Sequence, residues 1–266
     1  MTLLSPQVGA APDTFVESLV ALRRERAGSG SPVCVTWLNH FSIHAALDTA
    51  ADAVRRVDVC GIDGQFLQWL LRHPARTSAD LVVPPLLAAD PAIGSVLAIG
   101  GRGDRAALLA AALSGLAGRP IEVVAVDGFE GLPRGADLRR LVTEVAPDLL
   151  LVGLGAGLQE QVLLEAAAAM PQGYALTCGG FLDQVLQEGY YPSWAYPLRL
   201  NWLVRLCREP RRLWRRYTVD AVLGLARSRG WRRAMRDVPG LGTHARMSVL
   251  TGTGTGDPAR SLDAAA

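Results

Sequence analysis

The sequence contains no lysine, so arginine supplies all 27 of its basic side chains. A phosphate-binding P-loop needs a lysine between a glycine and a serine or threonine, and this class of nucleotide site is therefore excluded. Cysteine is also scarce: the four cysteines are widely spaced and form no C-x-x-C pair. This spacing argues against a disulfide framework or a zinc site and predicts reduced thiols in the core.

Long apolar segments are absent as well. The longest apolar runs without a charge, residues 81–89 and 149–158, fall short of the ~20 residues that a membrane-spanning helix needs. The first residues lack the basic and apolar regions of a signal peptide. We therefore expect a cytoplasmic protein. Half of the residues are hydrophobic, which is enough for a packed core.

Positive charge is concentrated near the C-terminus. The formal net charge is only +2, yet twelve arginines fall between Arg199 and Arg236, where Glu209 and Asp220 are the acidic residues. Such a density favours phosphates, anionic lipid or nucleic acid as a partner. Tryptophan and leucine recur there at helical spacing, which is typical of an amphipathic segment at a membrane interface.

Apolar runs alternate with helical patterns over most of the chain. Strands are predicted at residues 33–37, 57–60, 95–99, 121–126, 149–152 and 173–178, and helices at 14–26, 42–53, 65–72, 104–116, 137–145 and after Gly157. We expect Pro84-Pro85 to break any long helix between residues 78 and 90. The alternation predicts an α/β, Rossmann-like fold, with parallel strands and helices on both faces.

We expect four regions along the chain. They are a flexible tail over residues 1–13, an α/β core over 14–190 with two β-α halves meeting near residue 93, a basic amphipathic helical appendage over 191–250, and a disordered tail over 251–266.

The glycine-rich turn after the strand at 149–152 is the strongest local signal. Gly153, Gly155 and Gly157 allow a tight turn, and Gln159 and Glu160 fall in the first turn of the next helix. Free backbone N–H groups and the positive end of a helix suit a phosphate. A tight turn without a ligand explains the pattern equally well.

Polar residues follow two of the other strands, where ligands of parallel sheets bind. Asp63 could act as a general base, although an Asx turn or a helix cap is the simpler explanation. Thr36 and Asn39 offer neutral hydrogen bonds. His40 and His44 have a metal-binding spacing but no third ligand in sequence, so we expect ordinary histidines.

Three arginines of the basic segment share one helical face. Arg205, Arg212 and Arg215 are seven and three residues apart. Guanidinium groups make bidentate contacts, so this face fits a diphosphate. The alternative is a solvated basic face.

Taken together, these motifs resemble the WecG/TagA/CpsF family of glycosyltransferases over about residues 33–217. The strongest match is Ala146-Pro-Asp-Leu-Leu-Leu-Val-Gly-Leu-Gly-Ala-Gly-Leu-Gln-Glu160, against a family pattern of Pro-Asp, apolar strand and Gly-x-Gly-x-Pro-x-Gln-Glu. The second is Leu200 to Tyr217, which resembles the family's Leu-Glu-Trp-x-x-Arg-Leu, Glu-Pro-x-Arg and Arg-Tyr. Asp63-Gly64 and Arg76 to Leu81 match weaker signatures.

The chain departs from the family pattern at several points. Gly157 and Leu158 replace the Pro and Lys of the glycine motif, and Asn201 replaces the glutamate of Leu-Glu-Trp. The Thr-x-Asn of the first strand has an extra residue, Thr36-Trp-Leu-Asn39, and an Arg-Ala-Pro before the arginine-rich segment is missing. These changes indicate a divergent branch of the family.

The resemblance implies an inverting transferase that needs no metal or other cofactor. The implied donor is a UDP-sugar, such as UDP-N-acetylmannosamine. The implied acceptor is a polyprenyl-diphosphate-linked saccharide at the cytoplasmic face of an anionic membrane, in the synthesis of surface polysaccharides. Asp63 would be the base, and Thr36, Asn39, Gly155 and Gln159 would contact the donor. Arg76 would lie at the sugar or acceptor side, and Arg205, Arg212 and Arg215 would hold the diphosphate.

Two other functions remain open on the sequence. A dinucleotide-dependent oxidoreductase could use Gly153 to Gly157, although the G-x-G-x-x-G spacing and a following acidic residue at a strand end are missing. A non-enzymatic basic protein for a membrane or nucleic acid would leave the polar strand ends without a role. We expect no nucleic-acid partner, and a homo-oligomer is compatible with the sequence.

Overall fold

The computed structural model describes residues 11–44, 50–71, 77–187, 201–208, 210–211, 214 and 218–236. The C-terminal tail expected over 251–266 lies outside the described residues. So do residues 1–10 of the expected N-terminal tail, whereas residues 11–13 already belong to helix α1 (Ala11–Glu25).

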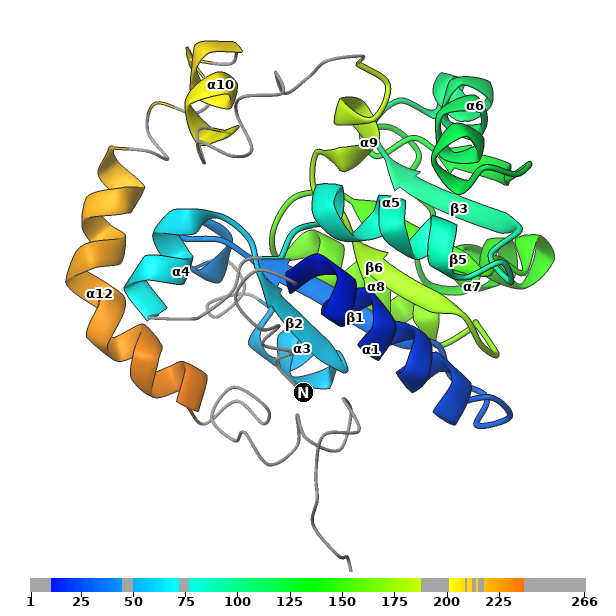
Figure 1. Cartoon of the computed structure of the whole chain (residues 1–266), viewed down its shortest axis with the longest axis horizontal. Helices are drawn as coiled ribbons and strands as arrows, with labels where there is room; N and C mark the ends of the chain where they lie inside the picture. Colours follow the sequence, from blue (N-terminus) through cyan, green and yellow to red (C-terminus); the bar gives the residue numbers. More distant parts are fainter. Residues whose placement is uncertain are drawn as a thin grey trace, which may run out of the picture.

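Six parallel strands form one sheet (Figure 1). The strands are β1 (Val33–Leu38), β2 (Val59–Ile62), β3 (Ser95–Gly100), β4 (Glu122–Val126), β5 (Leu149–Gly153) and β6 (Tyr174–Thr177). Their order across the sheet is β2-β1-β6-β5-β3-β4. The predicted α/β, Rossmann-like fold is confirmed. β1 pairs with β6, so the strands before and after residue 93 share one sheet.

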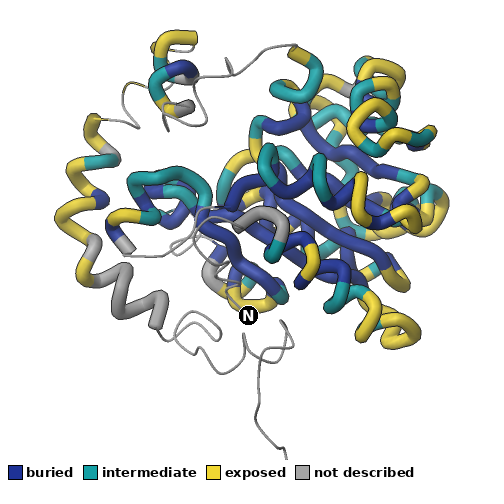
Figure 2. The backbone as a smooth tube through the Cα atoms, viewed as in Figure 1, coloured by how far each residue is buried: buried dark blue, intermediate teal, exposed yellow. Residues whose placement is uncertain are grey.

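Burial explains why the strands lack a clear alternation of polar and apolar residues. Every residue of β1, β2 and β6 is buried, because both faces of the sheet are covered (Figure 2). β4 lies at the edge and is only partly covered. The start of β2 is two residues later than expected.

Helices cover both faces. On one face, α5 (Ala79–Ala89) contacts both α1 and α6 (Ala106–Ala117), and the three helices bury Phe15, Leu86 and Leu113 against the sheet. On the other face, α7 (Gly135–Val145) contacts α8 (Leu158–Ala167), and α8 contacts α3 (Ala51–Arg56). Val142 and Leu163 belong to the second core cluster. These two layers complete the predicted architecture.

Helix α5 contradicts one expectation, because Pro84 and Pro85 lie inside it. A proline within a helix removes a hydrogen bond and costs ~3 kcal/mol. The same helix fully buries Val82, Val83, Leu86 and Leu87. Burying each of these side chains contributes ~1.5–3 kcal/mol, which outweighs the cost of the prolines.

The remaining elements surround the carboxyl edge of the sheet. They are α4 (Gln65–Leu71), the 3₁₀ turn η1 (Gly103–Arg105), α9 (Phe181–Gln184), α10 (Asn201–Arg208) and α12 (Val219–Arg236). α12 contacts α4 and runs alongside it (Figure 1). Among the described residues, no helix combines the length and apolar character needed to cross a membrane.

Candidate active site

A pocket of about 930 Å³ opens at the carboxyl ends of the strands. Every strand contributes to it through the residues that follow it or end it, which include Asn39, Asp63, Gly101, Gly128, Gly155 and Gly179. This pocket lies at the edge of the sheet where the sequence predicts a ligand. Trp202 of α10 and Ala221 of α12 also line it, so the C-terminal segment reaches this site.

Asp63 occupies the turn between β2 and α4. Its backbone N–H donates to the carbonyl oxygen of Leu38 at 2.7 Å, which ties the end of β2 to the end of β1. Gly64 follows with a φ of 81°, a backbone conformation that glycine adopts without strain. The carboxylate is partly exposed and faces the pocket.

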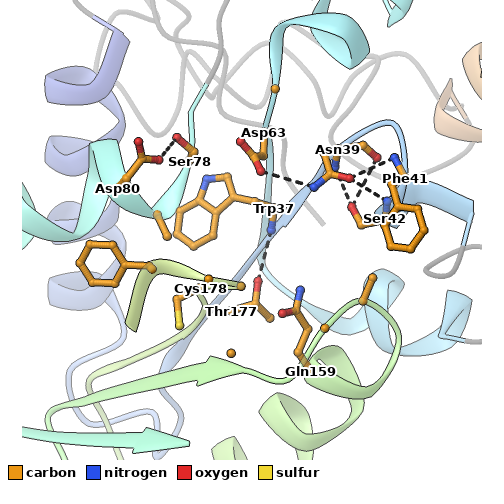
Figure 3. Close-up of a pocket in the computed structure, with 18 of the residues that line it drawn as sticks. Trp37, Asn39, Phe41, Ser42, Asp63, Ser78, Asp80, Gln159, Thr177 and Cys178 are labelled. Carbon is orange, nitrogen blue, oxygen red and sulfur yellow. Dashed lines mark hydrogen bonds between the residues drawn. The ribbon is translucent and has the colours of Figure 1, made fainter. Parts of the chain in front are cut away.

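Asn39 holds this carboxylate through its amide nitrogen (Figure 3). Asn39 Oδ1 accepts the backbone N–H groups of Phe41 at 3.0 Å and Ser42 at 2.8 Å, as a helix cap does. The amide nitrogen must then point the other way, and Nδ2 lies 3.4 Å from Asp63 Oδ2. The predicted base and a predicted contact residue are thus brought together by local capping.

Glycines form the wall of the pocket over the central strands. A Cβ atom on Gly153 would lie 2.5 Å from the carbonyl oxygen of Gly179, and one on Gly100 would lie 2.4 Å from that of Gly153. The backbones can approach this closely only without side chains. Gly155 differs, because a Cβ atom there would meet nothing within 4 Å, although its φ is +84°. This wall offers backbone groups to a ligand.

The start of α8 brings Gln159 to the pocket. Gly157 begins the helix with a φ of 89°, and its N–H donates to Glu160 Oε2 at 2.7 Å. Gln159 Nε2 donates to Glu160 Oε1 at 2.9 Å. Gln159 is only 5% exposed, yet it lines the pocket.

Thr36 does not line the pocket. It is fully buried on the α8 side of β1, where its hydroxyl donates to Glu160 Oε1 at 3.1 Å and lies 2.9 Å from Thr177 Oγ1. Neighbouring residues of a strand point to opposite faces. The pocket-lining side chain of β1 is accordingly Trp37, the residue after Thr36.

Sequence reasoning missed the aromatic lining. Trp37 donates its indole N–H to Thr77 Oγ1 at 3.2 Å, and its ring needs Gly61 opposite, where a Cβ atom would lie 2.4 Å away. The available signal in the sequence was Trp37 at the end of one predicted strand and Gly61 directly after the next. The other aromatic residues of this lining are Phe41, Phe66, Trp69, Phe129, Phe181 and Trp202.

The two histidines show no metal site. His40 packs edge-on against Phe66, with ring centroids 5.3 Å apart. His44 Nδ1 lies 3.2 Å from a guanidinium nitrogen of Arg227 in α12. No cluster of three potential metal ligands occurs in the part of the chain that the structure describes.

Comparison with known families identifies the chain. The model of the glycosyl transferase WecG/TagA/CpsF family matches residues 8–237, which include the whole sheet, α10 and α12. The chain belongs to this family. The predicted family is confirmed, and membership favours a transferase over the oxidoreductase and non-enzymatic alternatives. A search of curated proteins found no match.

In this glycosyltransferase the positions of the predicted arginines are incompletely described. Arg76, Arg212 and Arg215 lie outside the described residues, and Arg205 belongs to α10 without a described side chain. The described lining includes the carboxylates of Asp63, Asp80 and Asp183 but no arginine. A diphosphate would therefore need its cationic side chains from outside this described lining.

Proposed function

We propose that this protein is an inverting glycosyltransferase that moves a sugar from a UDP-sugar to a polyprenyl-diphosphate-linked saccharide. The observation that carries the proposal is the carboxylate of Asp63, held by Asn39 in a large pocket beside a glycine wall. The site has a carboxylate that Asn39 orients for proton transfer, and it has backbone groups for a nucleotide. An N-acetylmannosamine-like sugar or another hexose is the transferred group.

Asp63 acts as the general base. It accepts the proton of the acceptor hydroxyl while that oxygen forms a bond to the anomeric carbon of the sugar. The bond between this carbon and the diphosphate oxygen breaks on the opposite face, and UDP leaves with the bonding electrons. The anomeric configuration is therefore inverted. Asn39 orients the carboxylate and stabilises its charged form before the transfer.

The leaving diphosphate gains negative charge and needs cations. We assign this role to Arg205, Arg212 and Arg215. The support is topological: these residues fall between Trp202 and Ala221 in the sequence, and both of those residues line the pocket. Arg76 serves the sugar or acceptor side. With these arginines, the diphosphate is stabilised without a metal or another cofactor.

The lipid-linked acceptor places the enzyme on the inner face of an anionic membrane. α12 supports this assignment, because Val222, Leu223 and Leu225 are exposed large apolar residues and Arg227 and Arg229 are exposed too. Apolar side chains beside arginines are typical of helices at a membrane interface. The products enter the synthesis of exopolysaccharides or other cell-wall polymers.

A donor screen tests the proposal. The purified full-length protein is incubated with a panel of UDP-sugars and a polyprenyl-diphosphate-linked saccharide, and the release of UDP is measured with and without the acceptor. We expect acceptor-dependent release with at least one donor, no requirement for added metal, and no binding of NAD. Binding of NAD without binding of UDP would overturn the proposal.

A further inference from the structure

We propose that Glu160 is a positioning residue that aims the amide oxygen of Gln159 into the pocket. It follows that the ligand presents an O–H or N–H group to this oxygen. The inference rests on the proposed function only in taking UDP as the probe ligand. Glu160 is fully buried and is not among the residues that line the pocket, so its effect must pass through another side chain.

The carboxylate of Glu160 is the end point of three hydrogen bonds. Gly157 N donates to Oε2 at 2.7 Å, while Gln159 Nε2 at 2.9 Å and Thr36 Oγ1 at 3.1 Å donate to Oε1. An ionised carboxylate can accept all three, since it is an acceptor only. A glutamine in place of Glu160 could not accept at both positions, because its amide has an oxygen at one position and an NH₂ group at the other.

The donor and acceptor of each hydrogen bond in this network follow from the two groups at its ends, the backbone N–H of Trp37 and the carboxylate of Glu160. The backbone N–H of Trp37 can only donate, and Thr177 Oγ1 accepts it at 3.4 Å. The Thr177 hydroxyl then donates to Thr36 Oγ1 at 2.9 Å, and the Thr36 hydroxyl donates to Glu160. Residues of β1, β6 and α8 are thereby linked in one chain that ends on the carboxylate.

This chain determines the orientation of the Gln159 amide. Because Nε2 is committed to Glu160, Oε1 must face the other way. Among the described residues no donor reaches Oε1, although its atom is buried. Gln159 extends from the start of α8 toward Thr177 and lines the pocket (Figure 3).

An unpaired acceptor in a buried position selects for a donor on the ligand. Hydroxyl groups of a ribose or a sugar, or N–H groups of a base or an acetamido substituent, meet this requirement. The oxygens of an ionised diphosphate do not, because they are acceptors only. The geometry therefore assigns the amide oxygen of Gln159 to the nucleoside or sugar part of the donor.

The first test examines the free protein and needs no ligand. The side-chain ¹⁵N–¹H₂ signal of Gln159 is assigned by its loss in Gln159→Ala. We expect this signal to be protected from hydrogen exchange in the wild type, and to shift and lose protection in Glu160→Gln and Thr36→Val. Thr36→Ser keeps the hydroxyl and should restore the protection. An unchanged signal in both Glu160→Gln and Thr36→Val would overturn the inference.

The second test is a double-mutant cycle on the affinity for UDP. Glu160→Gln should weaken UDP binding about tenfold in the wild-type background, and much less when residue 159 is already alanine. Independent, additive losses would mean that Glu160 has a general structural role and would overturn the inference. If the wild type does not bind UDP at all, the proposed donor is wrong, and the exchange experiment alone decides the role of Glu160.

Discussion

The side-chain amide of Asn39 points its nitrogen at Asp63, with 3.4 Å between Nδ2 and Oδ2. Two backbone N–H groups occupy the oxygen of the same amide, so the nitrogen cannot turn away without breaking the helix cap. A residue that caps a helix thereby also orients the carboxylate that we propose as the base.

Replacing the carboxylate of Asp63 by an amide should abolish proton transfer and leave binding intact. We expect Asp63→Asn to lower turnover by ~10² or more, while the affinity for UDP and the melting temperature stay near those of the wild type. Asp80→Asn removes a second carboxylate of the same pocket and should cause a much smaller loss. Near-normal turnover of Asp63→Asn would show that this residue is not the base.

A side chain at Gly155 should interfere with the donor. Gly155→Val introduces a β-branched side chain at a φ of +84° and on the pocket surface. Gly30→Val is the matched control. Gly30 has a φ of +74°, a Cβ atom there would also meet nothing within 4 Å, and the residue does not line the pocket. Both variants should lose ~1–2 kcal/mol of folding free energy through strain, measured by urea unfolding. Only Gly155→Val should block UDP binding, and unchanged UDP affinity would limit this glycine to a structural role.

A substitution at the amino end of the sheet, opposite the pocket, should change stability and leave UDP binding unchanged. Tyr174, the first residue of β6, donates its hydroxyl to Asp90 Oδ2 at 2.7 Å, and Arg23 contacts the same oxygen at 3.1 Å. Burial and this hydrogen bond raise the pKa of Tyr174, so the phenol stays protonated. We expect Tyr174→Phe to lower the free energy of unfolding by ~1.5–3 kcal/mol without changing UDP affinity. An equally stable variant would contradict this role of the hydroxyl.

Thiol reactivity should separate the four cysteines. Burial raises the pKa of Cys34 to about 12 and also raises the pKa values of Cys60 and Cys178, whereas Cys207 is exposed. Alkylation requires the thiolate and access to it. At pH 8 the native protein should therefore take up iodoacetamide at Cys207 and not at the other three, as read by mass spectrometry. Rapid labelling of Cys34 in the native state would contradict the packing around β1.

Two sets of arginines should have different functions. Neutralising Arg227, Arg229, Arg232 and Arg233 together should weaken binding to anionic liposomes in a salt-dependent manner and spare turnover on a soluble acceptor analogue. Arg212→Ala or Arg215→Ala should lower turnover and spare liposome binding, since a cation at the leaving group is lost. If both sets changed liposome binding alone, the role in stabilising the diphosphate would be wrong.

The sequence by itself determined the sheet and the edge at which the pocket lies. Strand and helix patterns are local, and parallel strands place their carboxyl ends at one edge, so Asn39, Asp63 and Gly155 could be assigned to that edge in advance. Family membership was also accessible, because it depends on motifs along the chain.

Only the tertiary structure decided which side chains face the pocket. Thr36 was predicted as a contact, but its hydroxyl pairs with Glu160, 124 residues away, while Trp37 lines the pocket. The register of β1 against β6 sets this choice. Likewise, the continuation of α5 through Pro84 depends on burial against distant strands. Such contacts join residues far apart in the chain, so the stabilisation that they provide cannot be read from a local sequence pattern.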